Sequence, residues 1–468
     1  MCSAGAGCGR ETRRILCAAV SALLALVAGR AADAAVLTVG GDGTRFATIA
    51  AAVAAAEPGD TIRVSRGTYT GEVLLDKPVT LEGVERPILR GPDGGASVIT
   101  VTADACSITG FVIEHSGGDL QQEHSGVLLK SAANRVENNE LRDVLYGIYL
   151  YHSRANTIRG NVIRGRTELE FGQRGAGLHL WNSPDNLIED NVVTAARDGM
   201  YIQSSDGNVI RRNRISDLRY GLHYMFSDTN TFEDNVFAEN VAGAAIMYSR
   251  HITLTGNAFI RNRGFSSFGI LFQDCEACLA EGNFIIDNAT GVFMEALRTS
   301  TFHRNVIAEN DVAVQMFSSA DANIFYDNNF VENLSPLLLI GRTTTTQWDH
   351  NGRGNFWSDY EGYDLDGDGI GDVPHRVQNV FEYMEGNYPR LRLYLQSPAA
   401  QALAAAEKVF PIIPAPREMD RAPLMDAVQL RFPFERTAAP HLAQAGLLAL
   451  SVLMLGAALG ITWGVRRR

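Results

Sequence analysis

The chain has 468 residues, of which 46% are hydrophobic and 20% charged, and its formal net charge is −12. This length can build one large core or two modest ones, and the composition excludes a wholly disordered chain. The acidic balance argues against nucleic acid as a partner, because a phosphate-binding surface needs clustered Lys and Arg.

The first 35 residues are typical of a secretory signal peptide. Arg10, Arg13 and Arg14 precede an apolar run over 15–29, and small residues follow at 31–35, where a signal peptidase could cut. An uncleaved anchor is the alternative reading. In both cases we expect the bulk of the chain to be exported, by a route that the sequence leaves open.

An Ala-rich stretch over residues 46–57 predicts a helix, and Pro58-Gly-Asp-Thr-Ile62 begins the first strands. We expect this helix to cap the N-terminal end of the repeats that follow, because stacked strands must hide their open edges.

The pattern Asn-x-apolar-x-x-Asn recurs along the middle of the chain. From Asn139 to Asn328 its final Asn residues are separated by 22, 30, 22, 22, 22, 26, 22 and 23 residues. About 22 residues suit one coil of two or three short strands and are too few for a helical pair. The repeat therefore predicts an all-β chain, a right-handed parallel β-helix over 36–345. Asn tolerates left-handed backbone and can hydrogen-bond the Asn above and below it.

A short alternating strand follows each Asn pattern and opens in most repeats with Gly. The residues one and three after Gly are almost all apolar and should face the core, Met200, Met294 and Met316 among them. The residues two and four after Gly must then face outward, and many are aromatic, His or Met: Tyr149, Tyr151, His179, Trp181, Tyr201, His223, Met225 and Met247. An outward face of this kind usually binds something. The alternative is that a loop or the C-terminal segment covers it.

Two insertions, within 164–176 and 261–268, should bracket this face. Imidazole and thioether together suit Cu(I), which makes His179, His223, Met225 and Met247 candidate copper ligands. Coils two apart are separated by ~9.6 Å, so His179 and His223 cannot share one ion without movement. Tyr149, Tyr151, Trp181 and Tyr201 are candidate aromatic residues of the same binding face.

Three cysteines, Cys106, Cys275 and Cys278, lie outside the signal. The odd number permits one disulfide at most within the exported monomer. Cys275 and Cys278 are candidates for that disulfide, for a redox pair, for a pair of soft-metal ligands, or for two plain buried thiols.

Residues 346–396 contain an Asp- and Gly-rich loop after the last expected coil. Asp364, Asp366 and Asp368 alternate as in a Ca²⁺ loop, and Asp372 follows. His375 stands where an EF-hand has its twelfth-position Glu, so Asp372 could contribute instead. The alternative is an acidic turn that closes the β-helix.

The C-terminal part divides by composition. Residues 397–440 are rich in Pro and Ala and predict a linker or irregular segment. Residues 441–465 carry a run of 24 residues without charge, roughly 36 Å as a helix, which predicts a transmembrane helix. The arginines at 466–468 then stay in the cytoplasm, and the exported body is tethered to the inner membrane.

The repeats, the block from Asn355-Phe-Trp-Ser-Asp-Tyr to Asp-Gly-Asp-Gly-Ile-Gly-Asp-x-Pro374, and the opening Pro58-Gly-Asp-Thr-Ile with Lys77-Pro-Val-Thr-Leu resemble the NosD family over roughly 36–395. This resemblance implies a periplasmic protein with a pectin-lyase-like β-helix that is needed for maturation of nitrous oxide reductase. It implies copper delivery to the reductase apoprotein, with an ABC transporter membrane subunit, its ATPase and a copper chaperone as partners. Sulfur supply is the competing family interpretation, and no family motif assigns ligands.

Two further functions remain open from the residues. A polysaccharide-degrading enzyme needs paired carboxylates at ~5–9 Å, and the outward face offers only Glu295. A passive scaffold or carbohydrate-binding protein needs only the aromatic residues. We expect a non-catalytic factor, because no carboxylate pair is found. Since no ATP-binding motif is found either, energy must come from a partner ATPase.

Overall fold

The computed structural model describes residues 34–41, 45–93, 95–264, 266–341, 344–377, 397–398, 402 and 418–431. Residues 1–428 form one compact unit and 429–468 a second. The predicted signal peptide (apart from its last two residues), the transmembrane helix and the cytoplasmic tail lie outside the described residues. Within the described ranges, no helix has the length and apolar character needed to cross a membrane.

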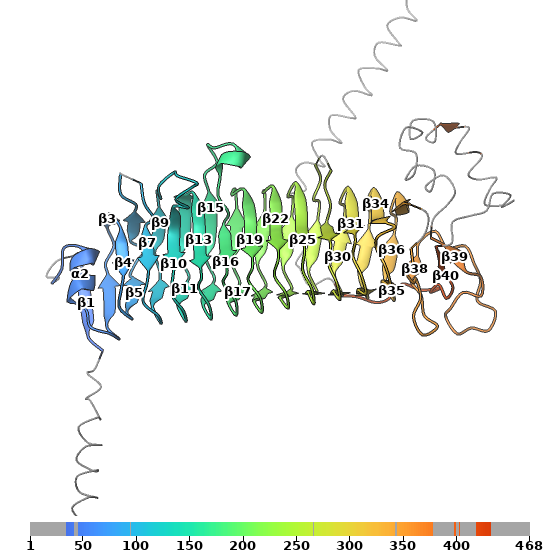
Figure 1. The fold of residues 1–468 in the computed structure, drawn as a ribbon, viewed down its shortest axis with the longest axis horizontal. Coiled ribbons are helices and arrows are strands. Elements are labelled where there is room, and N and C mark those ends of the chain that lie inside the picture. The colour runs from blue at the N-terminus through green and yellow to red at the C-terminus, as the bar shows by residue number, and fades with distance from the viewer. Residues whose placement is uncertain are drawn as a thin grey trace, which may run out of the picture. The chain divides into compact units, whose positions relative to one another are not determined.

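The chain winds into coils whose strands stack in three parallel sheets (Figure 1). Sheet A contains β1 (Val36–Val39), β2 (Thr61–Val64), β5 (Thr80–Gly83), β8 (Ser107–Thr109), β11 (Arg135–Glu137), β14 (Thr157–Arg159), β17 (Leu187–Glu189), β20 (Val209–Arg211), β23 (Thr231–Glu233), β26 (Thr253–Thr255), β29 (Leu279–Glu281), β32 (Thr301–His303) and β35 (Ile324–Tyr326).

Sheet B contains β3 (Thr68–Thr70), β6 (Ile88–Arg90), β9 (Val112–Glu114), β12 (Glu140–Val144), β15 (Val162–Gly165), β18 (Val192–Thr194), β21 (Arg214–Ser216), β24 (Val236–Ala238), β27 (Ala258–Ile260), β30 (Phe284–Ile286), β33 (Val306–Ala308), β36 (Asn329–Val331) and β38 (Phe356–Trp357).

Sheet C contains β4 (Val73–Leu75), β7 (Ile99–Val101), β10 (Ser125–Leu129), β13 (Tyr146–Tyr151), β16 (Leu178–Trp181), β19 (Asp198–Gln203), β22 (Tyr220–Met225), β25 (Ala242–Met247), β28 (Ile270–Gln273), β31 (Thr290–Glu295), β34 (Val312–Phe317) and β37 (Ser335–Ile340). Neighbouring strands within each sheet come from successive coils, as a parallel β-helix requires. The predicted right-handed parallel β-helix is therefore confirmed.

The core is a column of apolar side chains inside the coils. Every residue predicted to face inward from sheet C is fully buried, including Met200, Met294 and Met316. Aromatic rings stack between coils, as Phe302 does on Phe325 with ring centroids 4.5 Å apart. The Met side chains thus fill the core, and the prediction that they pack there is confirmed.

An asparagine ladder joins the coils at the turn between sheets A and B. The backbone amide and Nδ2 of Asn213 both donate to Oδ1 of Asn235, at 3.0 and 2.9 Å. The same pair of bonds repeats along Asn139, Asn161, Asn191, Asn213, Asn235, Asn257, Asn283, Asn305, Asn328 and Asn355.

The left-handed backbone lies one residue earlier than we predicted. The residues that precede ladder positions have positive φ, for example Arg212 at 53° and Asp234 at 51°. The ladder side chain must point inward to reach its neighbour, and the preceding residue makes the corner that turns it there. Non-Gly residues rarely adopt this conformation, so the ladder is what holds the corner in place.

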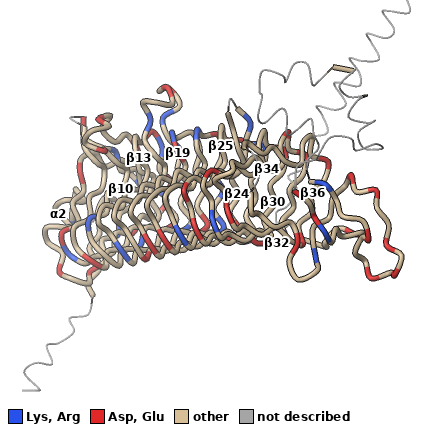
Figure 2. Tube along the Cα trace, turned by 45° about the vertical axis from the view of Figure 1, so that its right-hand side comes forward, with Lys and Arg blue, Asp and Glu red and all other residues tan. Residues whose placement is uncertain are grey.

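Charged residues also pair from coil to coil, and Figure 2 shows blue (Lys, Arg) and red (Asp, Glu) positions of the backbone recurring along the stack. The buried Glu189 carboxylate of β17 accepts from Arg211 at 2.7 Å and from Arg212 at 2.6 Å, and it also pairs with Arg159. Burial alone would raise the pKa of Glu189, but these guanidinium groups lower it to about 2.

At the N-terminal end, the helix α2 (Ile49–Ala55) contacts β1, β2 and β4. Thr48 caps it by accepting from the Ala51 amide at 3.2 Å. The Lys77 ammonium group donates to carbonyls at the other end of the helix, among them that of Ala56 at 2.9 Å. The helix is shorter than the Ala-rich stretch, because Thr48 fixes its start and Ala56 is already extended.

The predicted end of the β-helix at residue 345 is wrong. One more coil follows, in which Gln347 bridges Ile324, β38 pairs with β36, and Asn355 extends the asparagine ladder. This coil was missed because it lacks the Gly-led strand of the other repeats.

Residues 418–428, within the range predicted as a linker, pack against that last coil. The buried Glu418 accepts from Trp348 Nε1 at 3.0 Å, and the buried Asp420 accepts from Trp357 Nε1 at 2.9 Å. A short pair of strands, β39 (His375–Arg376) and β40 (Met419–Asp420), holds this segment in place. The composition predicts a linker, but these two carboxylates accept hydrogen bonds from indole N–H groups of the last coil, so the segment packs there.

Candidate metal centre

The outer face of sheet C carries two rows of side chains, one residue of each row per coil. We call them the first row and the second row. The first row contains Tyr149, His179, Tyr201, His223, Ala245, Leu271 and Phe293, and the second contains Tyr151, Trp181, Gln203, Met225, Met247, Gln273 and Glu295. The predicted register is therefore confirmed, and the candidate ligands share one face of one sheet.

Three loops lie at the corner between sheets B and C. Two contain the predicted insertions: residues 166–177, with the short helix η1 (Phe171–Gln173), and residues 261–269. The third, residues 115–124, was not predicted, because it precedes the regular repeats. Leu120 and Leu169 pack against the cluster around Tyr146, and Phe268 packs beside Ala245 and Met247.

These loops bury part of the first row. Tyr149 is 3% and His179 5% exposed. The alternative that loops cover the outward face therefore holds for these two residues. Burial, with Glu123 nearby, raises the pKa of the Tyr149 hydroxyl.

His179 lies in an aromatic cage. Its ring is 4.3 Å from that of Tyr149, 4.7 Å from that of Tyr201 and 5.4 Å from that of Tyr146, centroid to centroid. Neither ring nitrogen has a hydrogen-bond partner among the described residues. Burial, together with the charge of Arg197, lowers the pKa of His179 to about 3, so the ring is neutral at pH 7.

The structure does not bring His179 together with the other candidate ligands. The Tyr201 ring stands between His179 and His223, with centroids 4.7 and 4.9 Å from the two imidazoles. This agrees with the expectation that coils two apart cannot share an ion directly.

His223, Met225 and Met247 lie on the outer face of two neighbouring strands. His223 and Met225 alternate on β22, and Met225 pairs in register with Met247 on β25. Neighbouring strands are ~4.8 Å apart, and residues two apart on a strand are ~7 Å apart, which is within the reach of flexible thioether side chains. The neighbour of His223 on the next coil is the small Ala245. The His223 side chain is 17% exposed, so the group is covered but open to solvent.

A buried carboxylate, which the sequence analysis missed, holds His223. Asp198 begins β19 and is 0% exposed, and its Oδ2 lies 3.4 Å from His223 Nδ1. Arg219 Nη2 donates to the same oxygen at 2.9 Å, and Arg197 Nε at 3.2 Å. Burial would raise the pKa of Asp198, but the His223 hydrogen bond and the two arginines lower it. In the sequence, Asp198 stands out only as the acid among the residues that directly precede the strand-opening glycines of the coils around it, and the repeat does not reveal its contact with His223.

The second row ends in an exposed aromatic edge. Tyr151 is 39% exposed and Trp181 is half-buried. At the turn after this row, Phe226 and Tyr248 stack with centroids 4.9 Å apart and are 53% and 43% exposed.

The two cysteines near the middle of the stack are buried free thiols. The parallel bridge of Arg250 with Glu276 places Cys275 directly after Ser249 in a serine ladder, and Cys278 after Ile252. The Cys278 amide donates to Ser300 Oγ at 3.0 Å, as ladder residues do. A hydrogen bond to Cys278 and burial raise the pKa of Cys275. Of the predicted alternatives, the structure shows two buried thiols.

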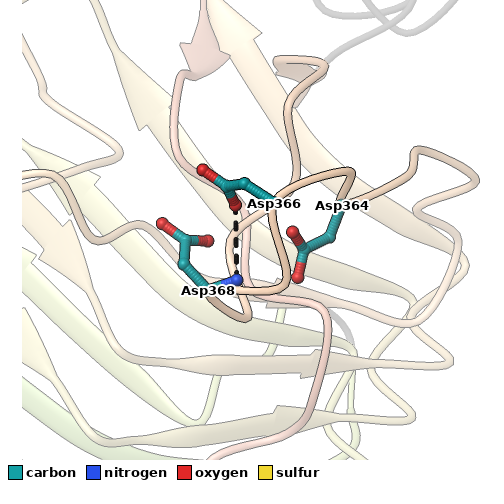
Figure 3. Close-up of side chains that lie close together, drawn as sticks. All are labelled: Asp364, Asp366 and Asp368. Carbon is teal, nitrogen blue, oxygen red and sulfur yellow. Dashed lines mark hydrogen bonds between the residues drawn. The ribbon is translucent and has the colours of Figure 1, made fainter.

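The acidic loop gathers three carboxylates on one side, as Figure 3 shows. Oxygen atoms of Asp364, Asp366 and Asp368 lie within 4.8 Å of one another. Asp364 accepts from the amides of Gly367 and Gly369 at 2.7 and 2.8 Å, and the Gly369 bond leads the causes that lower its pKa. Asp372 is not one of the three carboxylates that lie within this distance, and its carboxylate accepts from the Leu365 amide at 2.8 Å.

Two comparisons bear on the fold alone. The A-module of mannuronan C-5 epimerase AlgE6 from Azotobacter vinelandii aligns with a TM-score of 0.52 and 15% identity, over 64% of this chain and 92% of that one. The Dettilon tailspike protein gp208 aligns with the same score and identity, over 64% of this chain and 69% of that one.

Two comparisons bear on the family. Two proteins named "Probable ABC transporter binding protein NosD" are similar: that of Stutzerimonas stutzeri is 34% identical over 78% of this chain and 86% of its own length, and that of Pseudomonas aeruginosa is 35% identical over 77% and 87%. Residues 56–173 and 164–362 match the sequence model described as "Periplasmic copper-binding protein (NosD)". On these matches, which cover the coils and the block that follows them, the chain belongs to the NosD family.

Proposed function

We propose that this protein is a non-catalytic accessory factor that accepts copper in the periplasm and delivers it to the copper centres of nitrous oxide reductase. The observation that carries the proposal is the group of one imidazole and two thioethers, His223, Met225 and Met247, on one face of sheet C. Soft thioether ligands favour Cu(I) over hard cations. The description of the family as periplasmic and copper-binding supports the same cargo.

His179 takes a different part in this proposal. The tyrosines around its ring, and Tyr201 between it and His223, prevent it from binding the same ion as the three ligands. The neutral ring instead packs among Tyr146, Tyr149 and Tyr201 on the face beside the site.

The proposed partners follow from the relatives and from the chain's ends. The relatives are named as ABC transporter binding proteins, which supports docking on a transporter membrane subunit driven by a separate ATPase. A copper chaperone would load the site, and the reductase apoprotein would empty it. The apolar segment 441–465 would tether the body to the inner membrane.

A supply of sulfur or a scaffold role within the same assembly is the alternative. Carbohydrate binding is a further one, which the exposed Tyr151 and the half-buried Trp181 favour. Burial of Tyr149 weighs against a continuous aromatic platform for a sugar chain.

The test is anaerobic Cu(I) binding by the full chain in detergent, in competition with a chromophoric Cu(I) chelator. The variant replaces His223 by Gln and both Met225 and Met247 by Leu. The matched control, Gln203→Ala with Gln273→Ala, alters the same row on the coils to either side. We expect one tightly held Cu(I) in the wild type and the control, and none in the triple variant.

Wild-type protein without specific Cu(I) binding would overturn the copper role in favour of a scaffold or sulfur carrier. Binding that survives in the triple variant would reject these ligands. Binding of alginate-type oligosaccharides would favour the carbohydrate alternative.

A further inference from the structure

Asp198, which is not one of the proposed ligands, contacts the proposed ligand His223. Asp198 Oδ2 lies 3.4 Å from His223 Nδ1, and no described residue forms a hydrogen bond to His223 Nε2. The carboxylate is on β19 and the imidazole on β22, so the contact crosses from one coil to the next.

Protein histidines that bind metals almost always donate their second ring N–H to a carboxylate, carbonyl or water, which fixes the tautomer and the ring orientation. Here the Nδ1 side faces a carboxylate, and Nε2 is left for the ion. The carboxylate is fully buried, so its contact with the imidazole is shielded from water.

Two arginines beside Asp198 donate to its carboxylate and hold it in place as a hydrogen-bond acceptor. Arg219 donates to both of its oxygens, at 3.0 and 2.9 Å, and Arg197 Nε lies 3.2 Å from Oδ2. The Arg219 guanidinium stacks over the Tyr220 ring at 4.8 Å, which holds it in place. The rings of Tyr220 and Tyr201 lie 5.2 and 4.9 Å from that of His223 and limit its rotation.

We propose that Asp198 is a positioning residue of the copper site, which holds His223 with its proton on Nδ1 and presents Nε2 to Cu(I) beside Met225 and Met247. This inference rests on the proposed function, because it needs His223 to be a ligand. Asp198 would thus not contact the Cu(I) ion itself, but it would set the affinity with which His223 binds that ion.

The variant Asp198→Asn keeps the size of the side chain and removes its charge. Loss of an outer-shell partner of this kind costs ~10–100-fold in metal affinity, and we expect a loss of this size for Cu(I). The matched control is Glu189→Gln, which also removes a buried carboxylate held by arginines but has no histidine partner. We expect the control to bind Cu(I) as the wild type does.

A second measurement separates positioning from folding. The ¹⁵N chemical shifts of the His223 imidazole in the copper-free protein report which nitrogen carries the proton. We expect the Nδ1–H tautomer in the wild type and in Glu189→Gln, and a mixture in Asp198→Asn. Should Asp198→Asn fail to fold, Asp198→Glu keeps the charge, and we expect it to retain the tautomer with a smaller loss of affinity.

The outcomes are distinct. Wild-type affinity and tautomer in Asp198→Asn, with binding abolished in His223→Gln, would overturn the positioning role and leave the copper site intact. Unchanged Cu(I) binding in His223→Gln would overturn the ligand assignment and the positioning role with it.

Discussion

The Asp420 carboxylate occupies the rung that follows Asn355 in the asparagine ladder. Its Oδ2 accepts from the Asn355 backbone amide at 2.7 Å and from Asn355 Nδ2 at 3.2 Å, the same two bonds that each ladder Asn gives to the next. Oδ1 accepts from the Ala422 amide at 3.1 Å. An acid 65 residues away in the chain thus ends a series built from the repeats.

Replacement of Asp420 should therefore destabilise the C-terminal coil. Asp420→Ala leaves the two buried donors of Asn355 and the indole N–H of Trp357 without this acceptor, and we expect a loss of ~3 kcal/mol in the free energy of unfolding. Asp420→Asn keeps an acceptor oxygen of the kind found in every other rung, and should cost less than half as much. Urea unfolding followed by tryptophan fluorescence measures both, since Trp348 and Trp357 lie at this end. Equal losses in the two variants would contradict the role as a rung.

The caged His179 should make the protein acid-sensitive. Its pKa of about 3 lies below the unfolded value of 6.5, so the unfolded chain binds the proton more readily. This contribution to stability is present above pH 6.5 and is lost as the pH falls towards 3; at pH 5 the loss is about 2 kcal/mol. His179→Phe should remove this dependence, as measured by urea midpoints at pH 7 and 5.

The control for this prediction is His251→Ala, which alters an exposed histidine. It should leave the pH dependence as in the wild type. An identical decline between pH 7 and 5 in His179→Phe would show that other groups carry the acid sensitivity.

The acidic loop is predicted to bind Ca²⁺. Oxygen ligands at alternate positions suit this ion, and oxygen atoms of Asp364, Asp366 and Asp368 lie within 4.8 Å of one another. Ca²⁺ should raise the melting temperature of the wild type, and Asp366→Asn with Asp368→Asn should abolish the shift. Isothermal titration measures the binding, with Glu361→Gln as an exposed-acid control elsewhere in the same region. Equal Ca²⁺ shifts in both variants would leave the group as a closing turn.

The buried thiols should be dispensable for copper. Cys275→Ser with Cys278→Ser replaces both by the residue type found at neighbouring rungs, Ser249 and Ser300. We expect Cu(I) affinity within twofold of the wild type, and no reaction of the native wild-type thiols with a bulky thiol reagent. A large loss of Cu(I) binding in this variant would instead make the two cysteines the soft-metal ligands.

The repeat explains what could be predicted. A period near 22 with Asn and Gly at fixed offsets specifies coil, register and inward face at once, so the placement of His223, Met225 and Met247 on one face follows from counting. Residues that occur once carry no such signal. Asp198 and Asp420 each act through a contact to another coil or to a distant segment, and their chemistry shows only when that contact is built.

Burial of the first row could not be predicted from the spacing of the repeats either. Loop 115–124 precedes the regular repeats, and its position over Tyr149 follows from packing of residues such as Leu120. The repeat alone therefore places these side chains on the outer face and leaves open whether a loop covers them.

The asparagine ladder has a direction, since each rung donates to the rung that follows and accepts from the one before. Every interior coil consequently presents the same acceptor on one side and the same donors on the other. A whole coil could be duplicated or deleted between Asn191 and Asn305 without leaving a donor or acceptor of this ladder unmatched, whereas the two ends cannot be exchanged. The ladder thus allows the length of this protein to change during evolution in steps of one coil, whereas the capping segments must stay at the two ends.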